Sequence, residues 1–135
     1  MAQLLVIEDE RVLARNITRY FARLGHVVGL AHDGRAALEL ARQSPPDVVI
    51  VGLRLPGLNG LEVARELRRL DAQVHIVMIT GHGSINLAVD AMQAGSMDLL
   101  AKPLSLATLN EVVEHALEER PGRPTPHCRQ ERDRY

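Results

Sequence analysis

Apolar runs alternate along the chain with stretches in which apolar residues recur every three or four positions. The runs are short and nearly free of polar residues, which is typical of strands that are covered on both faces of a sheet. We predict five such strands, at residues 3–7, 26–31, 47–51, 74–79 and 97–101.

The stretches between the runs have the spacing of amphipathic helices. Gly25 is placed to stop the first helix, and Asp33 is placed to cap the second. The fourth helix opens at residues 81–84 and runs to residue 94, where Gly95 stops it. The apolar positions of the other four helices are Leu13, Ile17, Phe21 and Leu24, then Ala37, Leu40 and Ala41, then Leu61, Ala64 and Leu67, and finally Leu106, Leu109, Val113 and Leu117.

Strands and helices that alternate in this way predict an α/β fold, with a doubly wound parallel sheet between two helical layers. We place the first and fifth helices on one face of the sheet and the second to fourth on the other. The domain covers residues 1–119. Residues 120–135 hold three prolines and five arginines without an apolar period, which indicates a solvated tail or an interdomain linker.

Composition excludes several kinds of partner. The 16 basic and 17 acidic residues nearly balance, so the chain offers no electrostatic footprint for nucleic acid or for an anionic membrane. No run approaches the length of a membrane span, and the N-terminal residues lack the pattern of a signal peptide. The single cysteine, Cys128, cannot form an internal disulfide, so we expect a cytoplasmic protein.

Chemically active side chains follow the predicted strands. Ligands of open α/β sheets bind beyond the carboxyl ends of the strands. Glu8 and Asp9 follow the first strand, Gly52 the third, Thr80 the fourth and Lys102 the fifth. Carboxylates suit Mg²⁺, while an amine and a hydroxyl suit the oxygens of a phosphoryl group. Taken alone, each residue has an ordinary structural explanation, and only their convergence favours a site.

Four segments carry a resemblance to a known family. LLVIEDE, PDVVIVGLRLPGLNGLEV, VMITGH and LLAKP occur in the order and at the spacing of a response-regulator receiver domain. Residues 80–103 resemble most the receivers that precede ATPase domains in enhancer-binding transcription activators. The resemblance covers residues 1–119 and implies the flavodoxin-like strand order 2-1-3-4-5.

The resemblance also implies roles for individual residues. Glu8 and Asp9 match the acidic pair that holds Mg²⁺, and the backbone carbonyl of Arg54 matches a further metal ligand. Thr80 matches the hydroxyl that moves to bind the phosphoryl oxygens. Lys102 matches the lysine that pairs with the phosphoryl group or with its acceptor.

Three more positions are defined by the same comparison. Pro103 matches a proline that follows a cis peptide bond, so the Lys102–Pro103 bond is expected to be cis. Leu99 stands where the family usually has the aromatic ring that reports phosphorylation. Gly52 stands where the family has the aspartate that accepts phosphate.

Glycine cannot act as the carboxylate nucleophile, and it also removes a metal ligand. With Glu8, Asp9 and Lys102 remaining, the formal charge of the site changes from −2 to −1. We therefore expect Mg²⁺ to bind weakly, if at all. We also expect Lys102 to point into the cleft and to pair with Asp9 or Glu8, the only anions that this comparison leaves there.

We interpret the chain as a receiver domain that is not phosphorylated at the usual position and that works as an interaction module, not as an enzyme. A histidine kinase or an output domain, or a second copy of the chain, would bind the face formed by the fourth helix, the fifth strand and the fifth helix. We expect no direct binding of nucleic acid and no membrane association.

Three alternatives stay open. Gly52 could be structural, at a turn or a close backbone approach. The chain could be a conventional receiver with an introduced Asp→Gly change at this position. It could also be a flavodoxin-like protein that binds a small ligand. Against the last, no glycine-rich loop follows the first strand, and Glu8 and Asp9 would repel a phosphate there.

Overall fold

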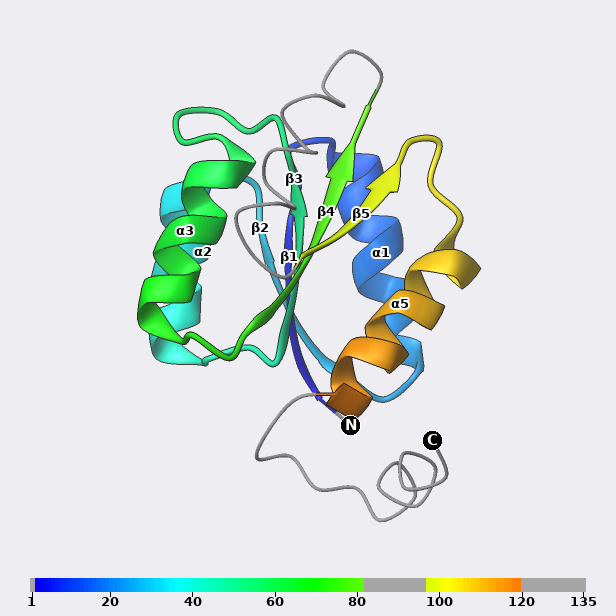
Figure 1. Ribbon diagram of the computed structural model, residues 1–135. Helices are drawn as coiled ribbons and strands as arrows, with labels where there is room; N and C mark the ends of the chain where they lie inside the picture. The colour runs from blue at the N-terminus through cyan, green and yellow to red at the C-terminus, as the bar shows by residue number, and fades with distance from the viewer. Residues whose placement is uncertain (1, 82–96, 120–135) are drawn as a thin grey trace.

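The computed structural model describes residues 2–81 and 97–119 and has a five-stranded parallel sheet between two helical layers (Figure 1). The strand order is β2-β1-β3-β4-β5, as predicted. The predicted fourth helix and the tail at residues 120–135 lie outside the described residues. The described elements are β1 (Gln3–Ile7), α1 (Arg11–Arg23), β2 (Val27–Ala31), α2 (Gly34–Gln43), β3 (Val48–Gly52), α3 (Gly60–Leu70), β4 (His75–Thr80), β5 (Met97–Ala101) and α5 (Leu106–Glu119).

Two apolar cores cover the two faces of the sheet. Phe21 and Ile17 of α1 pack with Leu109 of α5 against one face of the central strands. Leu38 of α2 and Leu67 of α3 lie in the core on the opposite face, and Figure 1 shows the two pairs of helices on either side of the sheet. The predicted placement is therefore confirmed for these four helices. Central strands β1 and β3 are buried almost throughout, as their uninterrupted apolar sequences require.

Strand boundaries differ from the prediction by one residue in β2, β3 and β4. In β3 the difference has a clear cause. Asp47 precedes the strand, and its buried side chain accepts a hydrogen bond of 2.9 Å from the backbone nitrogen of Gln3. The strand then continues through Gly52, which pairs in register with Ile79 of β4.

Helix α3 begins against the end of β3, and this contact shapes the edge of the sheet. Asn59 caps α3 in a reciprocal capping box with Glu62. The nitrogen of Gly60 donates a 2.8 Å hydrogen bond to the carbonyl of Leu53. A Cβ atom at Gly60 would lie 2.3 Å from the carbonyl oxygen of Gly52, so the close approach requires glycine. The predicted cap of α2 is confirmed, since Asp33 accepts from the nitrogen of Ala36.

Backbone hydrogen bonds carry the sheet one residue beyond its strands, where the candidate residues stand. The nitrogen of Glu8 donates to the carbonyl of Ala31 at 3.0 Å, and that of Lys102 donates to the carbonyl of Thr80 at 2.8 Å. These bonds fix the backbone from which the side chains enter the cleft.

Candidate functional site

A cleft of about 260 Å³ lies at the carboxyl ends of the strands. The predicted residues that line it are Glu8, Asp9, Gly52, Arg54, Thr80 and Lys102. Strand order brings them together, because β1 pairs with β3, β3 with β4, and β4 with β5. The sequence-based expectation that these residues share one cleft is therefore correct for the whole set.

Glu8 is the most buried charged residue of the cleft, with 1% of its surface exposed. Its Oε2 accepts a 3.0 Å hydrogen bond from the backbone nitrogen of Glu10. Its Oε1 is buried and has no hydrogen-bond partner among the described residues. Burial raises the pKa of Glu8 above its usual value, even though the Glu10 nitrogen and Lys102 act in the opposite direction.

Gly52 explains where this carboxyl group lies. A Cβ atom added to Gly52 would stand 2.6 Å from Oε1 of Glu8 and 3.3 Å from its Cδ. Glu8 therefore occupies the space in which any side chain at position 52 would begin. The absence of a side chain at Gly52 and the position of the Glu8 carboxyl group are geometrically coupled.

Lys102 lies between two carboxylates. Its ammonium group is 3.7 Å from Oε2 of Glu8, which confirms one of the two expected pairs, and it also contacts Glu10. Burial alone would lower the pKa of Lys102, but the hydrogen bond to Glu10 and the charges of Glu8, Glu10 and Asp9 raise it overall. Lys102 is therefore firmly protonated at neutral pH.

The assumption that Glu8 and Asp9 were the only anions near Lys102 was wrong. Glu10 adds a third carboxylate, so the formal charge with Lys102 is −2 and not −1. The signal was visible in the sequence, because three acidic residues in a row follow β1. The family comparison considered only positions with a known role in receiver domains, and Glu10 is not one of them. A glutamate just outside the strand has a side chain long enough to reach back over the cleft.

The remaining predicted residues lie at different depths. Thr80 is 2% exposed, and its hydroxyl group donates a 3.2 Å hydrogen bond to the carbonyl of Gly81. Leu99 does not line the cleft but packs against the core under α2 and α3. The peptide bond between Lys102 and Pro103 is cis, as expected.

This set of side chains suits a resident Mg²⁺ ion poorly. Mg²⁺ takes charged oxygen ligands in near-octahedral geometry. Glu8 is buried with a raised pKa, and the ammonium group of Lys102 already stands beside it. Only Asp9 and Glu10 offer exposed carboxylates. Within residues 2–81 and 97–119, no group of three or more histidine, cysteine, aspartate or glutamate side chains is arranged to hold a metal ion.

A parallel sheet of this strand order, with a cleft at the carboxyl ends of its strands, defines a flavodoxin-like α/β domain. The chain belongs to the response regulator receiver domain family, whose model matches residues 4–114. It is thus the receiver domain of a two-component response regulator.

Individual relatives agree with this assignment. The regulatory protein AtoC of Escherichia coli is 31% identical over 116 residues, which is 86% of this chain and 25% of AtoC. The C4-dicarboxylate transport transcriptional regulatory protein DctD of Pseudomonas aeruginosa is 36% identical over 118 residues, 87% of this chain and 26% of DctD. The response regulator MprA of Mycobacterium ulcerans is 36% identical, over 79% of this chain and 46% of MprA.

Solved structures show the same fold. The receiver domain of NtrX from Brucella abortus superposes with a TM-score of 0.81 at 32% identity, covering 86% of this chain and 98% of that domain. A response regulator receiver domain protein from Clostridium thermocellum gives a TM-score of 0.81 at 29% identity, with 86% and 94% covered. The chain spans between a quarter and a half of the three curated relatives. None of the described helices is long and apolar enough to span a membrane.

Proposed function

We propose that this receiver domain does not accept phosphate at position 52 and that it transmits its signal through contacts with protein partners. The observation that carries the proposal is the geometry of Gly52 and Glu8. Position 52 has no nucleophile, and a neighbouring carboxyl group fills the space beside it. The proposal assigns the chain no catalytic residue.

Glu8 does not replace the missing acceptor. Its Oε1 is buried, so a phosphoryl donor in solvent has no path to it. Its Oε2 is engaged by the nitrogen of Glu10 and lies beside Lys102. A raised pKa further reduces the fraction of Glu8 that is an anion, and only the anion is a good nucleophile.

The cationic group of the cleft is already paired with side chains of the same chain. Lys102, which would pair with a phosphoryl group, is paired with Glu8 and Glu10. The Glu10 carboxylate occupies the side of Lys102 that a phosphoryl group would otherwise contact. This arrangement supports weak Mg²⁺ binding and a signal that does not depend on phosphate.

The test is to incubate the chain with acetyl phosphate and Mg²⁺ and to measure its intact mass. We expect no phosphoryl adduct on the parent chain, and Gly52→Asp, which places a carboxylate at this position, is the comparison variant. NMR spectra with beryllofluoride and Mg²⁺ should leave the β4 and β5 amides of the parent unchanged. A stoichiometric adduct on Glu8 or Asp9 would contradict the proposal.

For the partner surface we propose the face that includes β5 and α5, used by a histidine kinase, an output domain or a second copy of the chain. Glu111 and Glu114 are exposed on α5, and the last turn of this helix carries no basic residue. An acidic helix favours a basic partner surface. Charge reversal at Glu111 and Glu114 should weaken partner binding, whereas reversal at Arg15 and Arg19 of α1 should not weaken the binding of a kinase or an output domain.

A further inference from the structure

The two helices that cover one face of the sheet carry opposite charges. Helix α1 contains four arginines and no aspartate or glutamate. Helix α5 contains four glutamates and no lysine or arginine. The helices are neighbours, since Ile17 of α1 and Val113 of α5 belong to one core (Figure 1). A chain whose net charge is close to zero therefore presents a basic and an acidic helix in the same layer.

The arginines of α1 form a row at four-residue spacing, and we call this row the arginine strip. Its members are Arg11, Arg15, Arg19 and Arg23, and all four are exposed. Arg15 and Arg19 each lie two residues from the buried Ile17, or about 200° around the helix, so they project away from the sheet. Within residues 2–81 and 97–119, no side chain of the arginine strip makes an ion pair or a hydrogen bond.

The glutamates of α5 also project away from the sheet. Glu111 lies two residues before the buried Val113, which again corresponds to about 200° around the helix. Glu111 and Glu114 are exposed, and neither forms an ion pair with a residue that the structure describes. Because both rows point outward from one layer, they stand beside each other without pairing.

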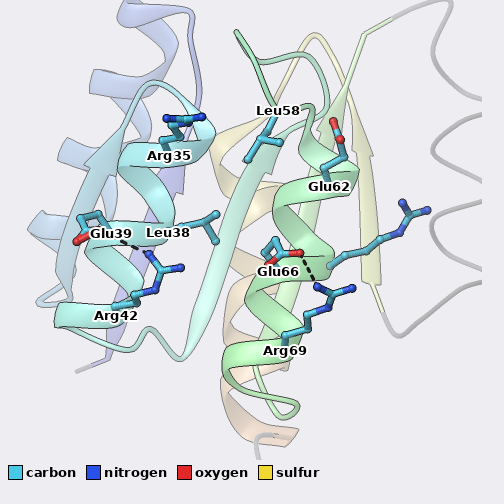
Figure 2. Close-up of a pocket in the computed structure, with 9 residues that line it drawn as sticks. Arg35, Leu38, Glu39, Arg42, Leu58, Glu62, Glu66 and Arg69 are labelled. Carbon is cyan, nitrogen blue, oxygen red and sulfur yellow. Dashed lines mark hydrogen bonds and ion pairs between the residues drawn. The ribbon is translucent and has the colours of Figure 1, made fainter.

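The helices on the other face of the sheet distribute their charges differently. Figure 2 shows Glu39 with Arg42 on α2, and Glu66 with Arg69 on α3. These two ion pairs measure 3.6 Å and 3.0 Å. Opposite charges are thus mixed and paired within α2 and within α3, whereas α1 and α5 keep their signs apart.

We propose that α1 and α5 form an interface with a second copy of the chain, in which the arginine strip of each copy lies on α5 of the other. A two-fold axis that passes between α1 and α5, perpendicular to their layer, brings α1 of one copy onto α5 of its partner and repeats the same contact. Arg15 and Arg19 lie about 6 Å apart along α1, and Glu111 and Glu114 about 4.5 Å apart along α5. Flexible guanidinium groups span this difference and bind carboxylates in a bidentate manner.

Charge selects a second copy over other occupants. A nucleic acid or an anionic membrane on the arginine strip would also lie beside the glutamates of α5, which repel it. A purely acidic or purely basic protein segment would match one helix and be repelled by the other. Residues 120–135 contain five arginines with Glu131 and Asp133, so this tail suits α5 but not the arginine strip. A second copy carries both charged helices in the required arrangement.

The inference deepens the proposed function for one of its three partners, because it adds α1 to the surface that is offered to a second copy. The two proposals have separate measurements. A phosphoryl adduct changes the covalent mass, whereas self-association changes the mass of the particle in solution. A monomeric chain that takes no phosphate contradicts only this inference, and a dimer that takes phosphate at the cleft contradicts only the absence of phosphorylation.

Sedimentation equilibrium of the whole chain tests the interface. We expect a dimer at low salt that dissociates as salt is added, because the Debye length falls from about 10 Å at 0.1 M to about 3 Å at 1 M. Arg15→Glu combined with Arg19→Glu should weaken the dimer by about tenfold or more. Glu111→Arg combined with Glu114→Arg should weaken it to a similar extent.

A matched control makes the same charge change on the other face of the sheet. Arg35 of α2 and Arg65 of α3 are both exposed. Arg35→Glu combined with Arg65→Glu should leave the Kd of the dimer within about twofold. Amide shifts that appear in NMR spectra as the parent chain is diluted should concentrate in α1 and α5, which locates the interface without any substitution.

Mixing the two reversed variants is the sharpest measurement. Each variant opposes like charges at the centre of the interface when it meets itself, but the two variants together oppose unlike charges in both contacts. An equimolar mixture should therefore form a heterodimer with a Kd within about threefold of the parent dimer. Recovery of association in the mixture also shows that both variants are folded.

Several results would overturn the inference. The parent chain stays monomeric at low salt, the reversals at Arg15 and Arg19 leave the dimer intact, or the mixed variants do not associate. Binding of fluorescein-labelled single-stranded DNA to the parent chain, lost on the reversals at Arg15 and Arg19, would also overturn it, since the occupant of the arginine strip is then a nucleic acid.

Discussion

Gly52→Asp places a carboxylate in a space that another carboxyl group already fills. The new Cβ atom would meet Oε1 of Glu8 at 2.6 Å, well inside contact distance. The neighbour is the far end of a flexible side chain, so the Glu8 carboxyl group can move aside. Movement does not remove the electrostatic conflict, because the new carboxylate stays in a cleft that Glu8, Asp9 and Glu10 already line.

The size of this conflict follows from Coulomb's law. Two like charges about 4 Å apart repel by about 1 kcal/mol in bulk water and by about 4 kcal/mol at the effective dielectric constant near a protein surface. Replacing glycine lowers the conformational entropy of the unfolded chain, which stabilises the folded state by roughly 0.4–1 kcal/mol. We expect a net loss of about 1–3 kcal/mol in the free energy of unfolding without metal, or a fall in Tm of about 4–12 °C.

The assay is thermal melting of the parent, Gly52→Asp and Gly52→Asn, each in EDTA and in Mg²⁺. Asparagine has nearly the same shape without the charge, so the difference between the two variants isolates the electrostatic part. Mg²⁺ should raise the Tm of Gly52→Asp, because the new carboxylate adds a ligand for the cation and the cation offsets the repulsion. The Tm of the parent and of Gly52→Asn should rise less when Mg²⁺ is added.

Two results would refute this reasoning. Equal melting of Gly52→Asp and Gly52→Asn in EDTA would mean that the carboxylates of the cleft do not interact. A Mg²⁺-dependent shift no larger for Gly52→Asp than for the parent would mean that the cleft is not a disabled site for metal and phosphate. The fold and the family assignment would stand in either case.

Three further substitutions test single contacts. Burial raises the pKa of Glu8, so the folded state binds its proton more tightly than the unfolded state. The change in the free energy of unfolding on Glu8→Gln should therefore become more favourable as the pH rises from below 4.5 and level off above the raised pKa of Glu8, as measured by urea unfolding across a pH series in EDTA. Gly60→Ala should cost about 1–3 kcal/mol in a urea melt, because its Cβ atom would meet the backbone carbonyl of Gly52 at 2.3 Å; an unchanged midpoint would contradict that contact. Asn59→Ala should cost about 1 kcal/mol through loss of the α3 cap, whereas Asn59→Asp should not.

Periodicity predicted most of the fold because the sheet is covered on both faces. The uninterrupted apolar run of β3 predicts a strand that is buried on both faces. The amphipathic helices between such strands must then pack on the two faces of the sheet. Parallel strands then bring their carboxyl ends to one edge, so Glu8, Thr80 and Lys102 were predictable as neighbours. The strand order required the family resemblance, since alternation alone does not distinguish one order from another.

Side-chain detail within the cleft was not predictable in the same way. Glu10 reaches Lys102 because the chain turns after β1 and its backbone nitrogen binds Glu8. How three consecutive acids are arranged in one cleft depends on that local turn and not on spacing.

The geometry of the cleft links Gly52 to the position of Glu8. A buried carboxyl group beside a second carboxylate is costly, because both cannot remain charged at close range without a cation. Glu8 can be buried at 1% exposure because position 52 adds no charge and Lys102 stands 3.7 Å away. The absence of a side chain at position 52 and the burial of Glu8 therefore support each other. Introducing aspartate at position 52 should let the domain accept phosphate there only to the extent that Glu8 moves out of this space.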